Sequence, residues 1–271
     1  MIKMITSIFS PCYRVINKIG EGVLSKFKTL FDMIGLFYDV LLGLFRFPRT
    51  RHLSMRQISA QVLFTGVDSF LIISLIAVLC GITLTVQGMS NMPEIGLGDF
   101  FANLMVIAII RELGPFFASL VVISRSGAAL AAHIGNMHVT KELKALEVMG
   151  IDKINFIVLP AFLGMILSLI CLNIYFDIIA VAAGLLIADI SINFPPSIFI
   201  KQLMAAITTT DLIVMIIKNV CFGSAIAIIT CYHGFSVTNI RTVPRAVYKA
   251  VMGSIVFTML FNICLTIGFY A

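Results

Sequence analysis

Four polar residues lie within apolar stretches of the sequence, where a polar side chain is costly unless it has a partner. Arg111 and Glu112 are adjacent in one such stretch, and Lys218 and Asn262 lie in two later ones. Charged groups at this depth in a membrane cost several kcal/mol unless they are paired or hydrated, and they commonly mark ligand or ion pathways. These residue types therefore predict a polar site that takes a charged or zwitterionic head group.

The positions of the two adjacent charges require partners elsewhere in the chain. Neighbouring residues of a helix project about 100° apart, so Arg111 and Glu112 cannot satisfy each other well. Lys218 is the candidate partner of Glu112, because it too lies inside an apolar run. The same residues allow a simpler interpretation, in which a buried ion pair only fixes how the helices pack.

The composition indicates an integral membrane protein. Of 271 residues, 60% are hydrophobic and 12% are charged, against roughly 25% charged residues in an ordinary soluble domain, and the mean hydropathy is +1.07. A soluble chain of this length could not keep so much apolar surface from water. The net charge of +6 is therefore better explained by membrane orientation than by nucleic-acid binding.

Several catalytic and cofactor-binding motifs are missing from the sequence. It contains no G-x-x-x-x-G-K-[ST] motif, which would cradle the phosphates of ATP, and no H-E-x-x-H motif for zinc. The six cysteines form no C-x-x-C pair and the four histidines are scattered, so we expect no metal site. We expect a protein with no catalytic residues and no cofactor of its own.

Hydropathy and charge predict an all-α membrane protein with five transmembrane helices. The Lys- and Arg-rich N-terminal segment is expected inside and the C-terminus outside. Residues 1–60 would form a cytoplasmic and interfacial segment, and residues 61–271 the transmembrane domain. The second span is too long to stand upright, so we expect a kink at Gly114 and Pro115. The predicted spans are 62–88, 100–134, 154–187, 211–232 and 246–270.

Two amphipathic segments are expected on the inner side of the membrane. Residues 24–47 carry one narrow polar stripe on an otherwise apolar helix, which predicts a helix lying in the membrane interface. A second, short helix is predicted over 139–150, where apolar residues recur at helical spacing. Glu142 and Glu147 face different ways around it, and either could meet a basic surface; the alternative is a solvated connecting helix. The residues of the predicted apolar ridge are Val139, Leu143, Leu146, Met149 and Gly150.

The stretch from Arg111 to Pro160 resembles the MlaE/YrbE permease family of lipid-transporting ABC systems. It reads RELGPFFASLVVISRSGAALAAHIGNMHVTKELKALEVMGIDKINFIVLP and follows, in order and spacing, the family pattern R-E-L-G-P…G-R-x-G-x-A-x-A-A-E-[IL]-G-x-M-x-V-T-E-Q-[IL]-x-A-L-x-x-M-G-x-D-P. Weaker likeness extends over the rest of the chain. The departures bear on the charge balance of the lipid cavity and on the ATPase contact, and they leave the expected fold intact. They are Ser124, His133, Lys141, Glu142, Lys153, Ala161 and Asn262.

The resemblance implies a non-catalytic permease subunit of an ABC transporter in the bacterial inner membrane. Such permeases are homodimers with an outward-opening cavity for phospholipid, and they serve outer-membrane lipid homeostasis. Two ATPase subunits, which bind ATP and Mg²⁺, would dock inside, and an MCE-domain protein would sit in the periplasm. The resemblance assigns head-group binding or gating to Arg111, Glu112, Lys218 and Asn262, and ATPase coupling to the helix over 139–150.

Two other functions stay open at this point. A stand-alone secondary transporter could use Arg111, Glu112 and Lys218 as an ion-coupled relay. An inactive scaffold could anchor an outer partner without transporting anything. The single coupling-type helix and the lack of an internal repeat weigh against the secondary transporter. The scaffold would keep its function after the apolar ridge of residues 139–150 is disrupted.

Overall fold

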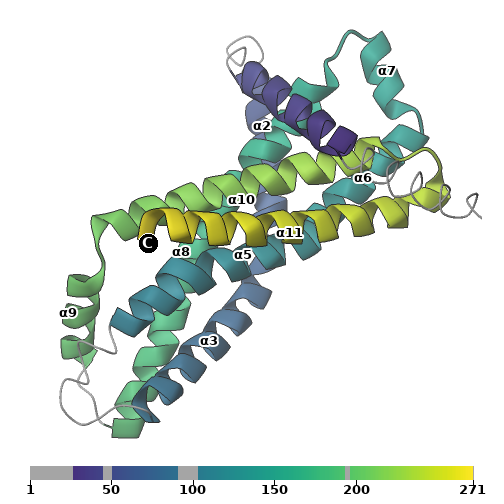
Figure 1. Ribbon diagram of the computed structural model, residues 1–271. Coiled ribbons are helices and arrows are strands. Elements are labelled where there is room, and N and C mark those ends of the chain that lie inside the picture. Colours follow the sequence, from purple (N-terminus) through teal and green to yellow (C-terminus); the bar gives the residue numbers. More distant parts are fainter. Residues whose placement is uncertain (1–26, 45–50, 91–102, 193–195, 271) are drawn as a thin grey trace, which may run out of the picture.

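The computed structural model describes residues 27–44, 51–90, 103–192 and 196–270, which are helical almost throughout and include no β-strand. Five segments of this described part are long and apolar enough to cross a membrane (Figure 1). They are Phe70–Gly88, Asn103–Val139, Ile154–Ile190, Thr209–Phe235 and Ile240–Tyr270. The predicted all-α architecture with five transmembrane helices is confirmed, and the chain is a multi-pass membrane protein.

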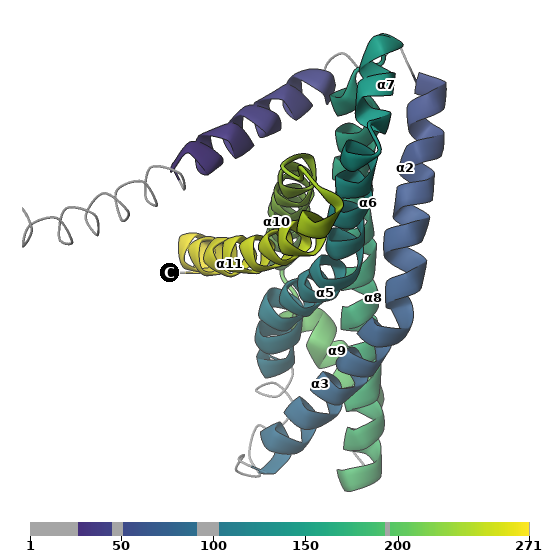
Figure 2. The same cartoon turned by 90° about the vertical axis from the view of Figure 1, so that its right-hand side faces the viewer.

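The first membrane-spanning helix has an extension that hydropathy did not reveal. α2 (Arg51–Gly66) leads through the 3-10 turn η2 (Val67–Ser69) into α3 (Phe70–Ser90), and the two helices meet at an angle (Figure 2). Ser69 Oγ donates a 2.8 Å hydrogen bond to the backbone carbonyl four residues earlier, a contact that often bends helices. Hydropathy finds only the apolar part of a helix, because helical hydrogen bonding does not stop at the membrane surface. The predicted boundary after residue 60 lies inside α2 and stays a prediction.

The second span is one continuous helix that contains two π-helical segments. Such segments are a recognised cause of helix bending. The first of them ends directly before the predicted kink at Gly114 and Pro115. Pro115 has no N–H, so the carbonyl of Arg111 cannot receive its usual α-helical hydrogen bond from residue 115. The parts of the span are η3 (Val106–Leu113), α5 (Gly114–Val122), η4 (Ile123–Gly127) and α6 (Ala128–Val139).

The long helix α8 lies at the centre of the bundle. η5 (Ile154–Val158) leads into α8 (Leu159–Ile192), which packs against α2, α3, α5 and α10 (Figure 1). Gly81 of α3 lies against the carbonyl of Ala180, and Gly223 of α10 lies against the backbone of α8. A Cβ at either glycine would collide with backbone atoms. Small residues therefore let these helices approach closely, as is usual inside membranes.

The last two spans run side by side and antiparallel (Figure 1). α9 (Pro196–Ala206) precedes α10 (Thr209–Phe235), and the 3-10 turn η6 (Ile240–Thr242) precedes α11 (Val243–Tyr270). Residues 188–210, which lie between the predicted third and fourth spans, are thus partly helical. The proline that opens α9 is compatible with a helix, because the first N–H groups of a helix have no intrahelical partner.

The predicted interfacial helix is present in its described part. The sequence predicts a helix over 24–47, and residues 27–44 are helical, while the two ends lie outside the described residues. Met33 and Val40 are buried against the bundle, whereas Phe31 is exposed. This helix lies at a steep angle to α2 (Figure 2). Its placement in the membrane interface stays a prediction.

Candidate functional site

Lys218 on α10 forms the centre of the polar site, and its side chain is fully buried. Nζ lies 3.0 Å from Glu112 Oε1 and donates hydrogen bonds of 2.8 Å to the carbonyl of Arg111 and 2.9 Å to Thr266 Oγ1. An ammonium group has three donors, so this environment satisfies it completely. The carbonyl of Arg111 is the one that Pro115 leaves without its α-helical donor. The proline therefore creates an acceptor that the lysine uses.

Glu112 is held by three donors and remains partly open. Besides Lys218, Thr266 Oγ1 donates to Oε1 at 2.8 Å, and Asn262 Nδ2 donates to Oε2 at 2.9 Å. The side chain of Glu112 keeps 31% of its surface exposed. It borders a recess of about 270 Å³, lined by Glu112, Leu113, Phe116, Met259, Asn262 and Ile263. A ligand in this recess would reach the carboxylate directly.

Arg111 points away from Glu112 and pairs with Asp211 at the start of α10. Its Nε lies 2.8 Å from Asp211 Oδ1, and Nη2 donates to Oδ2 at 3.3 Å. Tyr270 OH donates to the same carboxylate at 2.9 Å, and the guanidinium carbon lies 4.6 Å from the centre of the Tyr270 ring. Asp211 is itself fixed by a capping box with Thr208. The ends of α10 and α11 are thereby tied to the second span.

The four charges of the site cancel, and the two that stay partly exposed have opposite signs. Asp211 and Lys218 are fully buried, whereas the Arg111 side chain is 23% exposed and Glu112 is the more open carboxylate. A pair of this kind can bind a group that carries both a negative and a positive charge. In a site of low dielectric constant, these interactions are stronger than in water. Among the described residues, no group of His, Cys, Asp and Glu could hold a metal ion.

The structure joins the four polar residues that the sequence singled out into one network, and it adds three more. Sequence reasoning missed Asp211, Thr266 and Tyr270. On α11, Asn262, Thr266 and Tyr270 recur every four residues and so share one face of the helix. On α10, Asp211 and Lys218 are seven residues apart and also share a face. This spacing was a usable signal, but only once the two helices were known to pack together.

The coupling helix predicted over residues 139–150 is shorter in the structure, where it is α7 (Glu142–Val148). Val139 is instead the last residue of α6, because the chain turns at residues 140 and 141. α7 begins after Lys141, with a φ of 64°, and is followed by Gly150, with a φ of 73°, both in the left-handed region. The chain therefore turns sharply at each end, and α7 projects at one end of the bundle (Figure 1). Beyond α7, Lys153 Nζ lies 2.9 Å from Glu147 Oε1. The hydrogen bond from Lys153 lowers the pKa of Glu147 below its ordinary value.

The apolar ridge predicted on this helix faces inward over most of its length. Leu143 is buried, Leu146 is half-buried, and Val139 packs in a small cluster with Val237 and Val243. The apolar side chains that point outward are instead at the C-terminal end of α7. Val148 is 88% exposed and Met149 is 64% exposed. We call Val148 and Met149 the apolar tip of α7.

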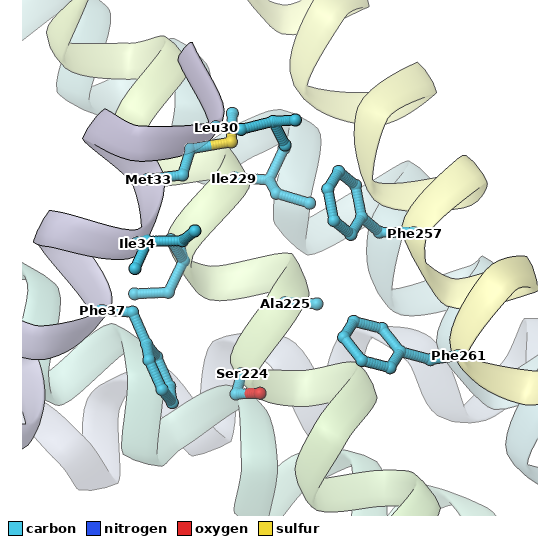
Figure 3. Close-up of a pocket in the computed structure, with 10 residues that line it drawn as sticks. Leu30, Met33, Ile34, Phe37, Ser224, Ala225, Ile229, Phe257 and Phe261 are labelled. Carbon is cyan, nitrogen blue, oxygen red and sulfur yellow. The ribbon is translucent and has the colours of Figure 1, made fainter. Parts of the chain in front are cut away.

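A second recess, of about 220 Å³, lies between the helix over 27–44 and the pair α10 and α11 (Figure 3). Phe257 and Phe261 of α11 line one wall, and Phe37 lies on the opposite side. Ser224 supplies one hydroxyl, and none of the ten lining residues is charged. This recess can accommodate hydrocarbon but has no group that would select a head group.

The described part of the chain combines five membrane spans, a paired polar site inside them and a short helix projecting at one end, which is the arrangement expected of a membrane permease. The family model "Permease MlaE" matches residues 58–267, and the chain belongs to the MlaE permease family. The resemblance seen in the stretch from Arg111 to Pro160 is thereby confirmed over most of the sequence.

Curated relatives support the same assignment. A probable ABC transporter permease protein of Rickettsia bellii is 31% identical over 211 residues, which cover 78% of this chain and 82% of that protein. The intermembrane phospholipid transport system permease protein MlaE of Haemophilus influenzae is 28% identical, with 81% and 83% covered. The chloroplastic protein TRIGALACTOSYLDIACYLGLYCEROL 1 of Arabidopsis thaliana is 28% identical, with 71% and 55% covered.

Proposed function

We propose that this chain is the non-catalytic transmembrane subunit of an ABC transporter that moves phospholipids at the bacterial inner membrane. It would act as a homodimer, exchange lipid with a periplasmic MCE-domain protein and so serve outer-membrane lipid homeostasis. The observation that carries the proposal is the pair Arg111 and Glu112, two opposite charges that stay partly exposed within a membrane span. The name of the Haemophilus influenzae relative supplies the substrate class.

The charges of the site suit the head group of a phospholipid. A phosphate can pair with the guanidinium of Arg111, while an amine or hydroxyl donor on the head group can approach Glu112 from the neighbouring recess. Asn262 already donates to Glu112 Oε2 and is the neutral member of the network. An incoming donor can therefore replace a neutral hydrogen bond without breaking the ion pair between Glu112 and the buried Lys218.

The energy for transport would come from a separate ATPase, which binds ATP and Mg²⁺. The present chain would contribute only α7, the helix through which movement of the ATPase would reach the membrane-spanning helices. α7 is a short helix at one end of the bundle, and it lies between two residues in the left-handed region. Its apolar tip offers an exposed apolar contact between charged neighbours. Lys141, Lys144 and Lys153 in this segment favour the cytoplasmic side by the positive-inside rule, and the C-terminus would then lie outside.

Reconstitution with the ATPase in proteoliposomes tests the proposal. Glu112→Gln should lower ATP-dependent lipid transport by about tenfold or more, because the carboxylate is the open anionic group of the site. The matched control is Asp189→Asn, which removes an exposed carboxylate of α8. Both variants should copurify with the ATPase. Unchanged transport by Glu112→Gln contradicts the head-group role, and transport driven by an ion gradient without ATPase would favour the ion-coupled relay of Arg111, Glu112 and Lys218.

A further inference from the structure

We propose that Asp177 on α8 binds a proton within the membrane and shares it with Asn173, at the point where α8 packs against Gly114. This site is distinct from the Arg111 and Glu112 network and does not depend on the proposed transport function. α5 and α8 lie against each other in the bundle (Figure 1). The ligand is a proton from water, which converts the carboxylate of Asp177 into a carboxylic acid.

Three buried polar atoms at this contact have no hydrogen-bond partner. Asn173 is fully buried, and neither its Nδ2 nor its Oδ1 is bonded. Asp177 Oδ1 is also buried and unbonded. Residues four apart on a helix lie one above the other, so the two side chains are neighbours on one face of α8. Unpaired polar groups inside a membrane are costly, and this group of three needs a common explanation.

The two side-chain oxygens converge on the same glycine. A Cβ placed on Gly114 would lie 2.5 Å from Asn173 Oδ1 and closer still to Asp177 Oδ1. If Asp177 is ionised, both oxygens beside Gly114 are acceptors, and neither can donate a hydrogen bond to the other. A protonated Asp177 resolves this conflict. Its hydroxyl can donate to Asn173 Oδ1, while Asn173 Nδ2 donates to Asp177 Oδ1, so that all three unpaired atoms are satisfied and the pair is neutral.

Among the described residues, the elements that pack around Asp177 offer it no cation that is free to pair with it. Phe117 of α5 and Phe176 of α8 stack beside the contact, at 6.1 Å between ring centres. α3 and α5 carry no charged residue, and α2 packs against the first half of α8, at Gly164 and Ser168. The other charged side chains on elements that pack against this part of α8, or on α8 itself, are Arg111, Glu112, Asp189, Lys201, Asp211 and Lys218.

None of these groups is placed to neutralise an ionised Asp177. Arg111 and Lys218 are engaged with Asp211 and Glu112, and Lys201 is exposed. Loss of the proton would therefore leave a negative charge against the backbone at Gly114, and the contact between α5 and α8 would weaken there. Gly114 is two residues beyond Glu112. The proton thus stabilises the helix packing directly beside the candidate head-group site.

Infrared spectroscopy of the purified, unlabelled protein in detergent tests for the bound proton. The wild type should show a carboxylic-acid carbonyl band at neutral pH that disappears in Asp177→Asn and persists in the matched control Asp189→Asn. Dicyclohexylcarbodiimide, an apolar reagent for protonated carboxyl groups, should modify Asp177, and the modification should decline as the pH rises. Absence of the band from the wild type, or its survival in Asp177→Asn, overturns the proposal.

Thermal unfolding supplies a second, independent readout. The melting temperature of the wild type should fall from neutral to alkaline pH, because deprotonation leaves an unpaired charge between α5 and α8. In Asp177→Asn the melting temperature should depend less on pH, since an amide at residue 177 can form the same two hydrogen bonds with Asn173 at any pH. Asp189→Asn should retain the wild-type slope. An unchanged slope in Asp177→Asn contradicts the proposal, whether or not the chain transports lipid.

Discussion

The ammonium group of Lys218 donates a 2.8 Å hydrogen bond to the backbone carbonyl of Arg111, in addition to its ion pair with Glu112. That carbonyl lacks its α-helical donor because Pro115 has no N–H. One side chain thus neutralises the Glu112 carboxylate and also completes the backbone of an irregular helix. Lys218 therefore connects the ion pair with Glu112 to the irregular backbone that precedes Pro115.

Lys218→Met should be strongly destabilising. It removes the counter-charge of Glu112 and the donor to the Arg111 carbonyl, and loss of one partner of a buried ion pair costs about 3–5 kcal/mol. The free energy of unfolding, measured with denaturant in detergent, checks this expectation. Glu112→Gln should also be destabilising, because it leaves the fully buried ammonium of Lys218 without a counter-charge, although the amide still accepts a hydrogen bond from Lys218.

The double variant Lys218→Met with Glu112→Gln is the control for this coupling. It should lose less stability than the two single variants added together, since no unpaired charge remains. Strict additivity would show that the two residues do not interact energetically, whatever their distance.

Tyr270→Phe should loosen the end of α11 without disturbing the rest of the site. The variant loses one hydrogen bond to the buried Asp211, worth about 1 kcal/mol, but keeps the ring beside the Arg111 guanidinium. Hydrogen exchange of the last turn of α11 should become faster, while the first turns of α11 remain unchanged. Equal exchange in wild type and variant would mean that Asp211 does not hold this helix end.

The sequence was sufficient to predict the spans and the centre of the site. Apolar length identifies a membrane helix because the bilayer fixes it at about 20 residues. An Arg and a Glu inside such a helix must find partners, and this requirement correctly paired Glu112 with Lys218.

The remaining members of the site depend on how helices pack, which hydropathy does not record. Asp211 and Tyr270 lie at helix ends and look like ordinary interfacial residues until α10 and α11 are placed side by side. Likewise, Leu143 and Met149 both fit the apolar ridge by spacing. Only the fold shows that Leu143 is buried and Met149 exposed.

Gly114→Ala should disrupt the contact between α5 and α8. The added methyl group would meet the side-chain oxygens of Asn173 and Asp177, and overpacking of this kind costs about 1–3 kcal/mol. Gly268→Ala is the matched control, because a Cβ there meets nothing within 4 Å and alanine favours a helix by about 0.5–1 kcal/mol. Melting temperatures of the two variants should therefore shift in opposite directions. Equal shifts would argue against a close contact at Gly114.

The ion pair between Glu147 and Lys153 should weaken at acidic pH. The hydrogen bond from Lys153 lowers the pKa of Glu147, so the pair stabilises the end of α7 at neutral pH. This contribution is lost as the pH falls through the lowered pKa and the carboxylate becomes protonated. NMR titration of the Glu147 carboxyl carbon checks the shift. In Lys153→Met the midpoint should move upward toward the ordinary range; an unchanged midpoint would mean that the pair does not form in solution.

The apolar tip of α7 should determine coupling to the ATPase, and this prediction depends on the proposed function. Met149→Asp places a charge where an apolar contact is expected, without disturbing the buried Leu143. Affinity for the purified ATPase should fall by about tenfold or more, equivalent to roughly 1.4 kcal/mol. ATP-dependent lipid transport should fall in parallel.

The matched control is Lys144→Gln, an exposed change on the same helix that leaves the tip intact. It should bind the ATPase nearly as well as the wild type. Melting temperatures of both variants should stay within a few degrees of the wild type, because neither side chain is buried. Wild-type affinity in Met149→Asp would mean that the ATPase contacts another surface. Full transport despite that substitution would remove α7 from the coupling path altogether.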